Sequence, residues 1–599
     1  MKRIFCKTFK VISVFLMPVK YNLSFFIFIY VLGLITIFIE VQTFHFKIPR
    51  FNFLSLILDI YILCLLLMVI PRRLRPFART IVSGIAYILA IINAFSVEHF
   101  YARIGPEILN VLLETNLRES SEFVNKYINL DVMWSGVGAI ILLMILHYFT
   151  FKYLNLNKFI FPHTFSILIK LCSSFLICAS IVFCCHSRIK IVKLMLVSTS
   201  EEVDVLISNH SQNTPFNNLL FSIKMREIAN NGLTVLAKTQ DYVTIDSCSY
   251  DTDNIILIIG ESYIKDHAQL YGYGKETTPR QVTRTELSEK GHLLSFNDVI
   301  SPSNLTSTVF KNVFSLHSMD EKTDWAYYPL FPVLFRKADY KVFFITNQFV
   351  QALGTDIFNL SGGLFLNHNR LNVAQFDFRN TQTHRYDMDL LEDYDSLKQY
   401  RADHNLIIFH LAGQHIDFGK RSPEEYKIFT LSDYQDRKDL NESEKQLVAD
   451  YDNATYYNDI VVDSIVRLFE NENAVVIYMP DHGEECFDET HRMGRLPSDN
   501  YAPETLRQEY RIPFWVWCSK LYIETHPTLY TQIEESRLKP FMTDDLPHLL
   551  LYLAGISSKY YSEKRNLVSP FFDVKRKRMI NGKCDYDKVI NQRMSQLSR

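Results

Sequence analysis

AVVIYMPDHGEE, residues 474–485, is the stretch around which the chain is organised. An apolar run stops there abruptly at Asp481 and His482. A short run of β-branched and aromatic residues that ends in a turn is typical of a buried strand in a parallel sheet. We therefore expect both side chains at the carboxyl end of a strand, where open α/β sheets bind ligands. A carboxylate and an imidazole there can bind Zn²⁺, although Asp-His-Gly alone also fits a surface turn.

A second apolar run ends in the same kind of chemistry. Residues 254–262, NIILIIGES, predict a buried strand that is followed directly by Glu261. Two buried strands ending in carboxylates are hard to explain by packing, because an uncompensated buried carboxylate costs several kcal/mol unless it is paired or bound to metal. The two strand ends together predict a metal site.

The first third of the chain carries most of the apolar residues, which make up 48% of the 599-residue sequence. Five apolar segments each approach the ~20 residues that a membrane-spanning helix needs. They are residues 23–41, 51–70, 80–97, 133–151 and 166–185. A buried core helix could explain any one of them, but five in series predict a transmembrane domain over residues 1–185.

The charges in the loops orient these spans. Residues 72–79 contain four arginines, and basic residues also precede the first span and follow the fourth, whereas residues 98–132 are mainly acidic. The positive-inside rule then places the N-terminus in the cytoplasm, and an odd number of spans places everything after residue 185 outside. No cleavage site for a signal peptide follows residues 1–20. Asp59 lies within a span, and the sequence leaves open whether it serves packing or function.

The rest of the chain is predicted to consist of a connector followed by a catalytic domain. Residues 186–250 mix apolar helical spacing with polar turns, as in an amphipathic bridge on the membrane surface or a folded linker. Residues 251–599 alternate strand-like and helix-like segments, which predicts an α/β/α domain with a mainly parallel sheet. Expected strands are 254–260, 341–346, 405–411, 474–479 and 511–517. The basic run 575–578 reads as a solvated end.

Charge and cysteine content add two points. The net charge of −2 gives no sign of nucleic-acid binding. Four cysteines fall in the outer domain, and they could form up to two disulfides or none. They are Cys248, Cys486, Cys518 and Cys584.

A nucleophile would complete the site. Residues 300–310, ISPSNLTSTVF, concentrate hydroxyl side chains before a helix-like run. A hydroxyl at a helix N-terminus is most often a cap. Beside a metal it can instead attack as an alkoxide, and the helix dipole then favours an anionic phosphate opposite it.

With these motifs in place, the chain resembles the membrane-bound phosphoethanolamine transferases of the alkaline phosphatase superfamily. The resemblance covers nearly the whole chain. It rests on the five spans and on motifs at 260–262, 271–273, 306–315, 410–415, 451–453, 481–484 and 491–494. The motifs at 260–262 and 481–483 are also compatible with sulfatases, phosphoglycerol transferases and phosphodiesterases of the same superfamily.

The resemblance implies roles for particular residues. Glu261, Asp481 and His482 would bind one zinc ion, with Thr306 as both ligand and nucleophile. His415 and His491 would lie across the site and hold phosphate oxygens or a second zinc. An isolated histidine is more often a satisfied polar group, and this is the interpretation adopted for His410.

Three departures limit the analogy. The lipid A-modifying branch has cysteines where this chain has Pro302 and Asn312, so that disulfide cannot form. The donor-contact pattern N-x-x-x-T-x-x-x-E is matched by Thr115 and Glu119, but Val111 stands at its first position.

The third departure concerns phosphate binding. A family motif with Asn and Lys falls on Asn347 and Gln348, without the lysine. Asn347 is carried over as a substrate-binding residue. Neutralisation of the phosphate must then differ from that in the family or come from elsewhere.

The expected function is transfer of phosphoethanolamine from phosphatidylethanolamine to an envelope glycolipid, either lipid A or a lipopolysaccharide core sugar, through a covalent phosphothreonine. The chain would be a multi-pass protein of a bacterial inner membrane with a periplasmic C-terminal domain, and the missing cysteine pair favours a core sugar. The alternatives are a phosphoglycerol transferase or sulfatase-like hydrolase of the same fold and a non-catalytic membrane sensor or assembly protein. Residues 305–308 do not form a sulfatase modification motif, and an intact set of site residues argues against the sensor.

Overall fold

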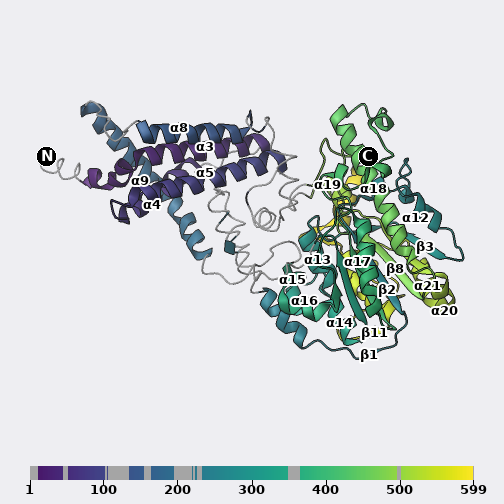
Figure 1. The fold of residues 1–599 in the computed structure, drawn as a ribbon. Coiled ribbons are helices and arrows are strands. Elements are labelled where there is room, and N and C mark those ends of the chain that lie inside the picture. The colour runs from purple at the N-terminus through teal and green to yellow at the C-terminus, as the bar shows by residue number, and fades with distance from the viewer. Residues whose placement is uncertain are drawn as a thin grey trace. The chain divides into compact units, whose positions relative to one another are not determined.

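The structure is a computed structural model that describes residues 11–44, 52–100, 104, 132, 134–153, 163–194, 219, 223–224, 232–348, 364–495 and 501–597. It divides into two compact units, Met1–Asn230 and Asn231–Arg599 (Figure 1). Each unit is described by itself.

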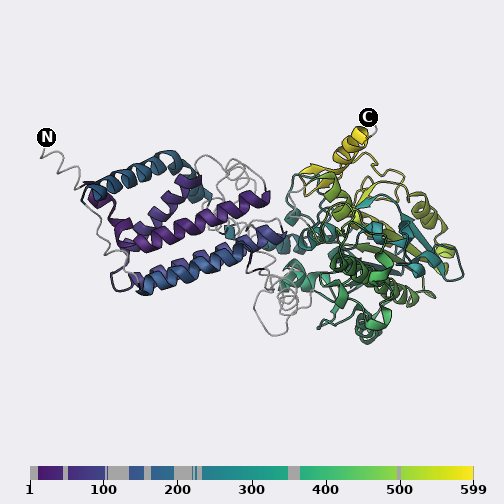
Figure 2. The ribbon, with the colours of Figure 1, turned by 90° about the horizontal axis from the view of Figure 1, so that it is seen from above.

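The first unit is a bundle of long apolar helices. Its elements are α2 (Met17–Tyr21), α3 (Leu23–Phe44), α4 (Asn52–Val69), α5 (Arg75–Phe100), α8 (Gly136–Tyr153) and α9 (His163–Leu194). Within the described residues, five helices are long and apolar enough to cross a membrane, which confirms the predicted spans. Helix α3 packs against α4, α5 and α8, and α4 packs against α9 (Figure 2).

Asp59 has a partner inside this bundle. Helix α9 continues past the predicted span, and its Arg188 binds both carboxylate oxygens of Asp59, at 2.5 Å from Nε and 2.6 Å from Nη2. Nη2 also donates to the carbonyl oxygen of Ser55 at 3.3 Å. Charged groups within membrane helices are costly unless they pair, so this bidentate contact accounts for Asp59 and ties α9 to α4.

The second unit is built on a seven-stranded sheet with the order β3-β9-β8-β2-β7-β5-β6. The strands are β2 (Asn254–Gly260), β3 (Gly291–Phe296), β5 (Lys341–Thr346), β6 (Phe378–Arg379), β7 (Asn405–His410), β8 (Ala474–Pro480) and β9 (Phe514–Ser519). The pairs from β6 to β8 are parallel, and β9 is antiparallel to both β8 and β3. The sheet is therefore mainly parallel, as predicted.

Helices cover both faces of this sheet. The helices of this unit are α12 (Pro279–Arg284), α13 (Thr306–Phe314), α14 (Phe331–Lys337), α15 (Leu364–Asn367), α16 (Asn369–Gln375), α17 (Leu390–Leu397), α18 (Glu442–Arg467), α19 (Pro503–Tyr510), α20 (Lys520–Thr525), α21 (Pro527–Glu535), α22 (Leu546–Ala554) and α23 (Tyr586–Leu597). Side chains of α13, α14 and α22 share one buried cluster with the sheet, and those of α17 and α18 share another.

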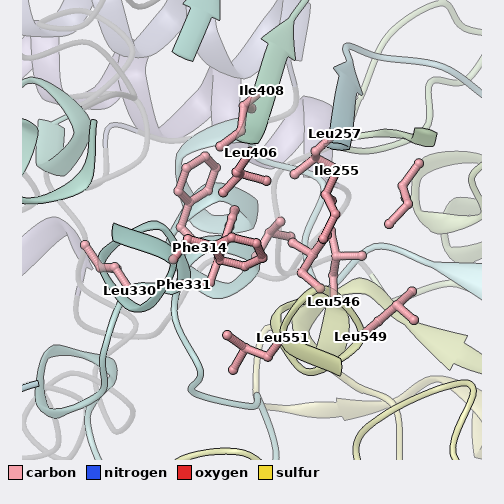
Figure 3. Packing of buried hydrophobic residues seen from close by; sticks show 14 of the residues in the cluster. Ile255, Leu257, Phe314, Leu330, Phe331, Leu406, Ile408, Leu546, Leu549 and Leu551 are labelled. Atoms are coloured by element: carbon pink, nitrogen blue, oxygen red, sulfur yellow. The ribbon is translucent and has the colours of Figure 1, made fainter. Parts of the chain in front are cut away.

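The central strands are apolar throughout because both of their faces are buried. Along β2, Ile255 and Leu257 point into the first cluster, whereas Ile256 and Ile258 point into the second. Figure 3 shows the first cluster, in which side chains of β2 and β7 meet those of α13, α14 and α22. This packing produces the expected α/β/α layers.

Two segments near the ends of this unit differ from what the sequence predicted. Residues 232–241 are helical, and Leu233, Leu236 and Ala237 are buried in the first cluster, so the last part of the segment 186–250 belongs to this unit. The expectation that 575–578 is solvated holds for Lys575 and Lys577, which are exposed, but it is wrong for the two arginines. Arg576 pairs with Asp544 and Asp545. Arg578 is 4% exposed and pairs with carboxylates elsewhere in the unit.

The cysteines of this unit are all free thiols. Cys486 and Cys518 are buried, and Cys248 and Cys584 are half-buried. The structure therefore contains none of the disulfides that the sequence left open among these four residues.

Candidate active site

The carboxyl ends of the central strands bring the site together. Strands β2 and β8 are hydrogen-bonded neighbours in parallel register, with Gly260 opposite Pro480. The next residue along β2 is Glu261, and the next two along β8 are Asp481 and His482. The pairing therefore places all three side chains at one edge of the sheet.

These three residues form a buried cluster. All are 0% exposed, and one ligand atom from each lies within 4.8 Å of the others. Nε2 of His482 lies 3.0 Å from Oδ2 of Asp481 and 3.4 Å from Oε1 of Glu261. Within the described part of the chain, this is the one group of three or more His, Cys, Asp and Glu side chains whose ligand atoms all lie within 4.8 Å of one another.

The hydrogen bonds around the cluster engage the outer atoms of Asp481 and His482 and leave Oδ2 and Nε2 directed into the cluster. Oδ1 of Asp481 accepts from the backbone N–H groups of Ser262 at 3.1 Å and His482 at 2.8 Å, whereas its buried Oδ2 makes no hydrogen bond. Nδ1 of His482 lies 2.9 Å from the carbonyl oxygen of Gly483. A carbonyl only accepts, so Nδ1 carries the proton of the neutral ring and Nε2 presents a lone pair to the cluster.

Thr306 is the first residue of α13 and lies against the same cluster. Its Oγ1 is 3.3 Å from Nε2 of His482 and 3.4 and 3.5 Å from the two carboxylate oxygens of Glu261. The buried apolar side of α13 packs into the first cluster, which fixes the start of the helix. The positive end of the helix dipole thus lies beside the hydroxyl, where it favours an anion.

The charges in the cluster favour a cation between the side chains. Burial opposes the charge of Glu261, but His482, His415 and Arg495 hold its pKa well below its usual range. Burial and the Glu261 charge raise the pKa of Asp481. Two carboxylates that repel each other here would be stabilised by a divalent ion.

The donor set fits zinc. Two carboxylates, one imidazole nitrogen and one hydroxyl offer four oxygen and nitrogen ligands, which is the usual coordination number of Zn²⁺. The Oδ2 atom of Asp481, buried without a hydrogen bond, is the type of atom that a bound metal would satisfy.

The backbone that carries Glu261 is tightly held. Ser262 adopts a positive φ of 53°, and its carbonyl accepts a hydrogen bond from the Tyr451 hydroxyl at 2.7 Å. Gly413 has a φ of +46°, and a Cβ there would lie 2.8 Å from the nitrogen of Glu261. Only glycine allows this close approach without a shift, so residue 413 helps to fix the Glu261 carboxylate.

Comparison with known proteins identifies the family. The sulfatase family matches residues 253–556, more than half of the chain. The chain belongs to the sulfatase family. The matched residues include Glu261, Thr306, Asp481 and His482.

Relatives of this sulfatase-family chain share a narrower description. The phosphoethanolamine transferase EptC of Escherichia coli (strain K12) is 25% identical over 510 residues, which cover 84% of each protein. The phosphoethanolamine transferase EptA of Helicobacter pylori (strain ATCC 700392 / 26695) is 29% identical over 320 residues, 52% of this chain and 57% of that one. These matches confirm the resemblance to the phosphoethanolamine transferases.

A solved structure supports the two-part fold. The integral membrane protein lipooligosaccharide phosphoethanolamine transferase A (EptA) from Neisseria meningitidis matches with a TM-score of 0.59 and 17% identity. The match covers 92% of this chain and 98% of that one. It extends through the membrane helices as well as the sulfatase-family domain.

The other predicted site residues of the sulfatase-family chain lie outside the cluster itself, each in surroundings of its own. His415 is half-buried. Burial lowers its pKa to about 3 despite the opposing charge of Glu261, so it is a neutral imidazole close to the cluster. His491 is exposed and lies near the surface carboxylate Asp439, whose pKa is lowered first by the hydrogen bonds from Arg437 and least by His491. Thr115 and Glu119 lie outside the described residues.

Three residues at the ends of β5 and β7 differ in their contacts. Asn347 is buried, and its amide donates to Asp387 at 2.8 Å and accepts from the backbone N–H of His384 at 2.6 Å. Gln348, which sequence reasoning passed over, donates to Oε2 of Glu261 at 3.2 Å. Its position two residues after a predicted strand was the available signal. His410 contacts Oγ1 of Thr346 at 3.0 Å within the core, as expected of a packing residue.

Arg495 is the second residue that the sequence did not reveal. Its Nη1 lies 2.5 Å from Nε2 of His482 and donates to the carbonyl oxygen of Asn304 at 2.7 Å. It follows Gly494 in an irregular segment, where no periodic sequence pattern predicts which way a side chain points. The site of the sulfatase-family chain therefore contains a guanidinium group as well as the zinc-type ligands.

Proposed function

We propose that the protein transfers phosphoethanolamine from phosphatidylethanolamine to a glycolipid of the bacterial envelope. The observation that carries the proposal is the position of the Thr306 hydroxyl, within 3.5 Å of both Glu261 and His482 at the N-terminus of a helix. The description shared by the relatives supports the transferred group.

Glu261, Asp481 and His482 would hold a zinc ion together with Thr306. When bound, zinc would supply positive charge that makes the hydroxyl more acidic and offsets the charge that develops on the phosphate. Ser262 and Gln348 would orient the Glu261 carboxylate, to which they donate at 2.8 and 3.2 Å. Gly483 would keep the ring of His482 in the tautomer that presents Nε2.

The transfer takes place in two balanced steps. In the first, Oγ1 of Thr306 forms a bond to phosphorus and the bond from phosphorus to the glycerol oxygen breaks. The diacylglycerol leaves with the proton that the threonine loses. In the second, an acceptor oxygen attacks phosphorus, the bond to Thr306 breaks, and the proton of the acceptor returns to the threonine.

The membrane helices explain how such substrates reach the site. The donor is a lipid and the acceptor is a glycolipid, so both would diffuse in the plane of the bilayer on which the domain is anchored by its five apolar helices. The charges of the loops predict that the domain lies outside the cytoplasm, which is the periplasm for a bacterial inner membrane. Pro302 and Asn312 replace a cysteine pair of the lipid A-modifying branch, which favours a core sugar as acceptor.

Mass analysis of the trapped intermediate tests the proposal. Full-length protein in detergent is loaded with zinc and incubated with a mixture of phosphatidylethanolamine and phosphatidylglycerol, without acceptor, and its peptides are analysed. We expect a phosphoethanolamine adduct on Thr306 that is absent from the Thr306→Ala variant. A phosphoglycerol adduct would favour the phosphoglycerol transferase instead. No adduct, together with no transfer, would favour the non-catalytic alternative.

A further inference from the structure

The proposed reaction places a phosphodiester, itself an anion, beside two carboxylates. A zinc ion shared by Glu261, Asp481 and an ionised Thr306 would have its charge more than balanced by these ligands alone. A further positive charge is therefore needed where the phosphate binds. Gln348, the nearest side chain on the β5 side of Glu261, is neutral.

Arg495 lies where this charge is needed. Its Nη1 donates to the carbonyl oxygen of Asn304, two residues before Thr306, at 2.7 Å. Its Nε lies 3.5 Å from Oε2 of Glu484. The guanidinium group therefore spans the start of α13 and the strand end that carries His482.

Neighbouring arginines have other partners. Arg492 binds the buried Glu509 at 2.5 Å. Arg421 donates to the carbonyl oxygens of His415 at 3.1 Å and Ile416 at 2.6 Å. Both are engaged in contacts that hold loops rather than in contacts with the cluster itself.

One contact of Arg495 is exchangeable. Nη1 lies 2.5 Å from Nε2 of His482, whose single lone pair can serve either an N–H donor or a metal ion. Zinc bound to Nε2 would displace this N–H group, which would then be available to a phosphate oxygen. Arginine suits that role because its planar fork of donors matches phosphate oxygens.

We propose that Arg495 is a catalytic residue that binds the phosphodiester of the donor lipid beside Thr306. This assignment rests on the proposed function, since it presumes that a phosphodiester reaches the site. It makes the guanidinium group, rather than a second metal ion, the source of the additional positive charge.

The test measures binding without turnover. Full-length Thr306→Ala protein in detergent, with its zinc content measured, is titrated with glycerophosphoethanolamine, and the same titration is made on Thr306→Ala proteins that also carry Arg495→Gln or Arg495→Lys. Loss of a hydrogen-bonded charge predicts affinity weakened about tenfold or more for Arg495→Gln, and by less for Arg495→Lys. The matched control is Arg507→Gln, which removes a surface arginine paired with Glu489.

The zinc affinity of the Arg495→Gln variant shows whether Arg495 contacts the substrate or only supports the structure of the site. Because Nη1 competes for the lone pair of His482, Arg495→Gln should bind zinc at least as tightly as its parent while it binds the phosphodiester less well. Affinity for glycerophosphoethanolamine that is unchanged, or that is restored by saturating zinc, would overturn the assignment. Thr306→Ala protein whose phosphodiester binding does not depend on zinc would instead overturn the proposed function, whatever Arg495→Gln does.

Discussion

Two clusters in the second unit contain the same residue types, one histidine and two acidic residues, and yet they differ in what they can bind; of their six side chains only that of Asp488, at 25% exposed, reaches the surface. Around His267, Nδ1 lies 2.5 Å from Asp452 and Nε2 lies 3.0 Å from Asp488. Around His482, Nδ1 faces a backbone carbonyl, and Nε2 faces Asp481 and Glu261 together.

The His267 cluster is closed. Both ring nitrogens face carboxylates, so the ring is a doubly donating imidazolium without a lone pair for a metal. The second oxygen of Asp452 accepts from the hydroxyls of Tyr273 and Tyr434.

The His482 cluster is open, because its histidine keeps a lone pair and Asp481 keeps an oxygen without a hydrogen bond. Composition alone does not distinguish a structural ion pair from a metal site. The distinction lies in which acceptor atoms are left unsatisfied.

Asp481→Asn should produce the largest effect on zinc binding. The amide oxygen can still accept from the N–H groups of Ser262 and His482, so the fold should survive, but the inward-facing group becomes an NH₂ that cannot bind zinc. We expect zinc affinity and transfer to fall by more than about 100-fold. Metal analysis after dialysis and a transfer assay measure this, and full zinc occupancy in the variant would contradict the open-site interpretation.

Asp452→Asn makes the matching change in the closed cluster. It removes the charge that stabilises the His267 imidazolium, and loss of one partner of a buried ion pair typically costs about 3–5 kcal/mol. Denaturant unfolding of the detergent-solubilised protein should show this loss, while zinc bound per folded molecule stays as in the parent. Loss of zinc without loss of stability would reverse the roles given to the two clusters.

The pH dependence of stability should report the closed cluster. Burial opposes the charge of His267, but Asp452 and Asp488 overcome it and raise its pKa to about 10, above the ordinary value of 6.5. A raised histidine pKa stabilises the folded state fully below pH 6.5, and this stabilisation is lost as pH rises toward 10. We expect a loss on the order of 1 kcal/mol per pH unit in that window. Unfolding midpoints measured across the window should decline less steeply in His267→Gln than in the parent, and equal slopes would contradict the assignment.

The smallest effects are expected beside the nucleophile. Ser307→Ala and Thr308→Ala leave Thr306 and the open cluster in place, so transfer should stay within about twofold of the parent. Thr306→Ala, assayed alongside, should have no activity. An adduct on Thr308, or activity that survives in Thr306→Ala, would show that a different hydroxyl belongs to the cluster.

The site residues could be predicted from the sequence where they directly follow an apolar strand. The runs 254–260 and 474–480 are buried on both faces, and they could be recognised because nothing polar interrupts them before Glu261 and Asp481. The same pattern predicted β5 and β7. It missed β3, an edge strand with two half-buried residues among its six, and β6, which has two residues.

Partners that meet only through folding could not be predicted. Arg576 and Arg578 form part of a basic run, and nothing local shows that Asp544 and Asp298 lie against them. Arg495 reaches His482 from an irregular segment for the same reason. His267 gave no signal because its partners are 185 and 221 residues away along the chain.

The pairing of β2 with β8 also sets an order of events during synthesis. Glu261 is made long before Asp481, and the two carboxylates meet only when β8 docks beside β2. Until then the chain has half of a ligand set and little affinity for a metal ion, since a preformed site rarely exists before folding. Pairing between such distant segments is a slow step because a long loop must close first. Metal uptake would therefore follow the docking of β8 beside β2 instead of nucleating the sheet, and a chain arrested before residue 474 would remain metal-free however much of its sheet had formed.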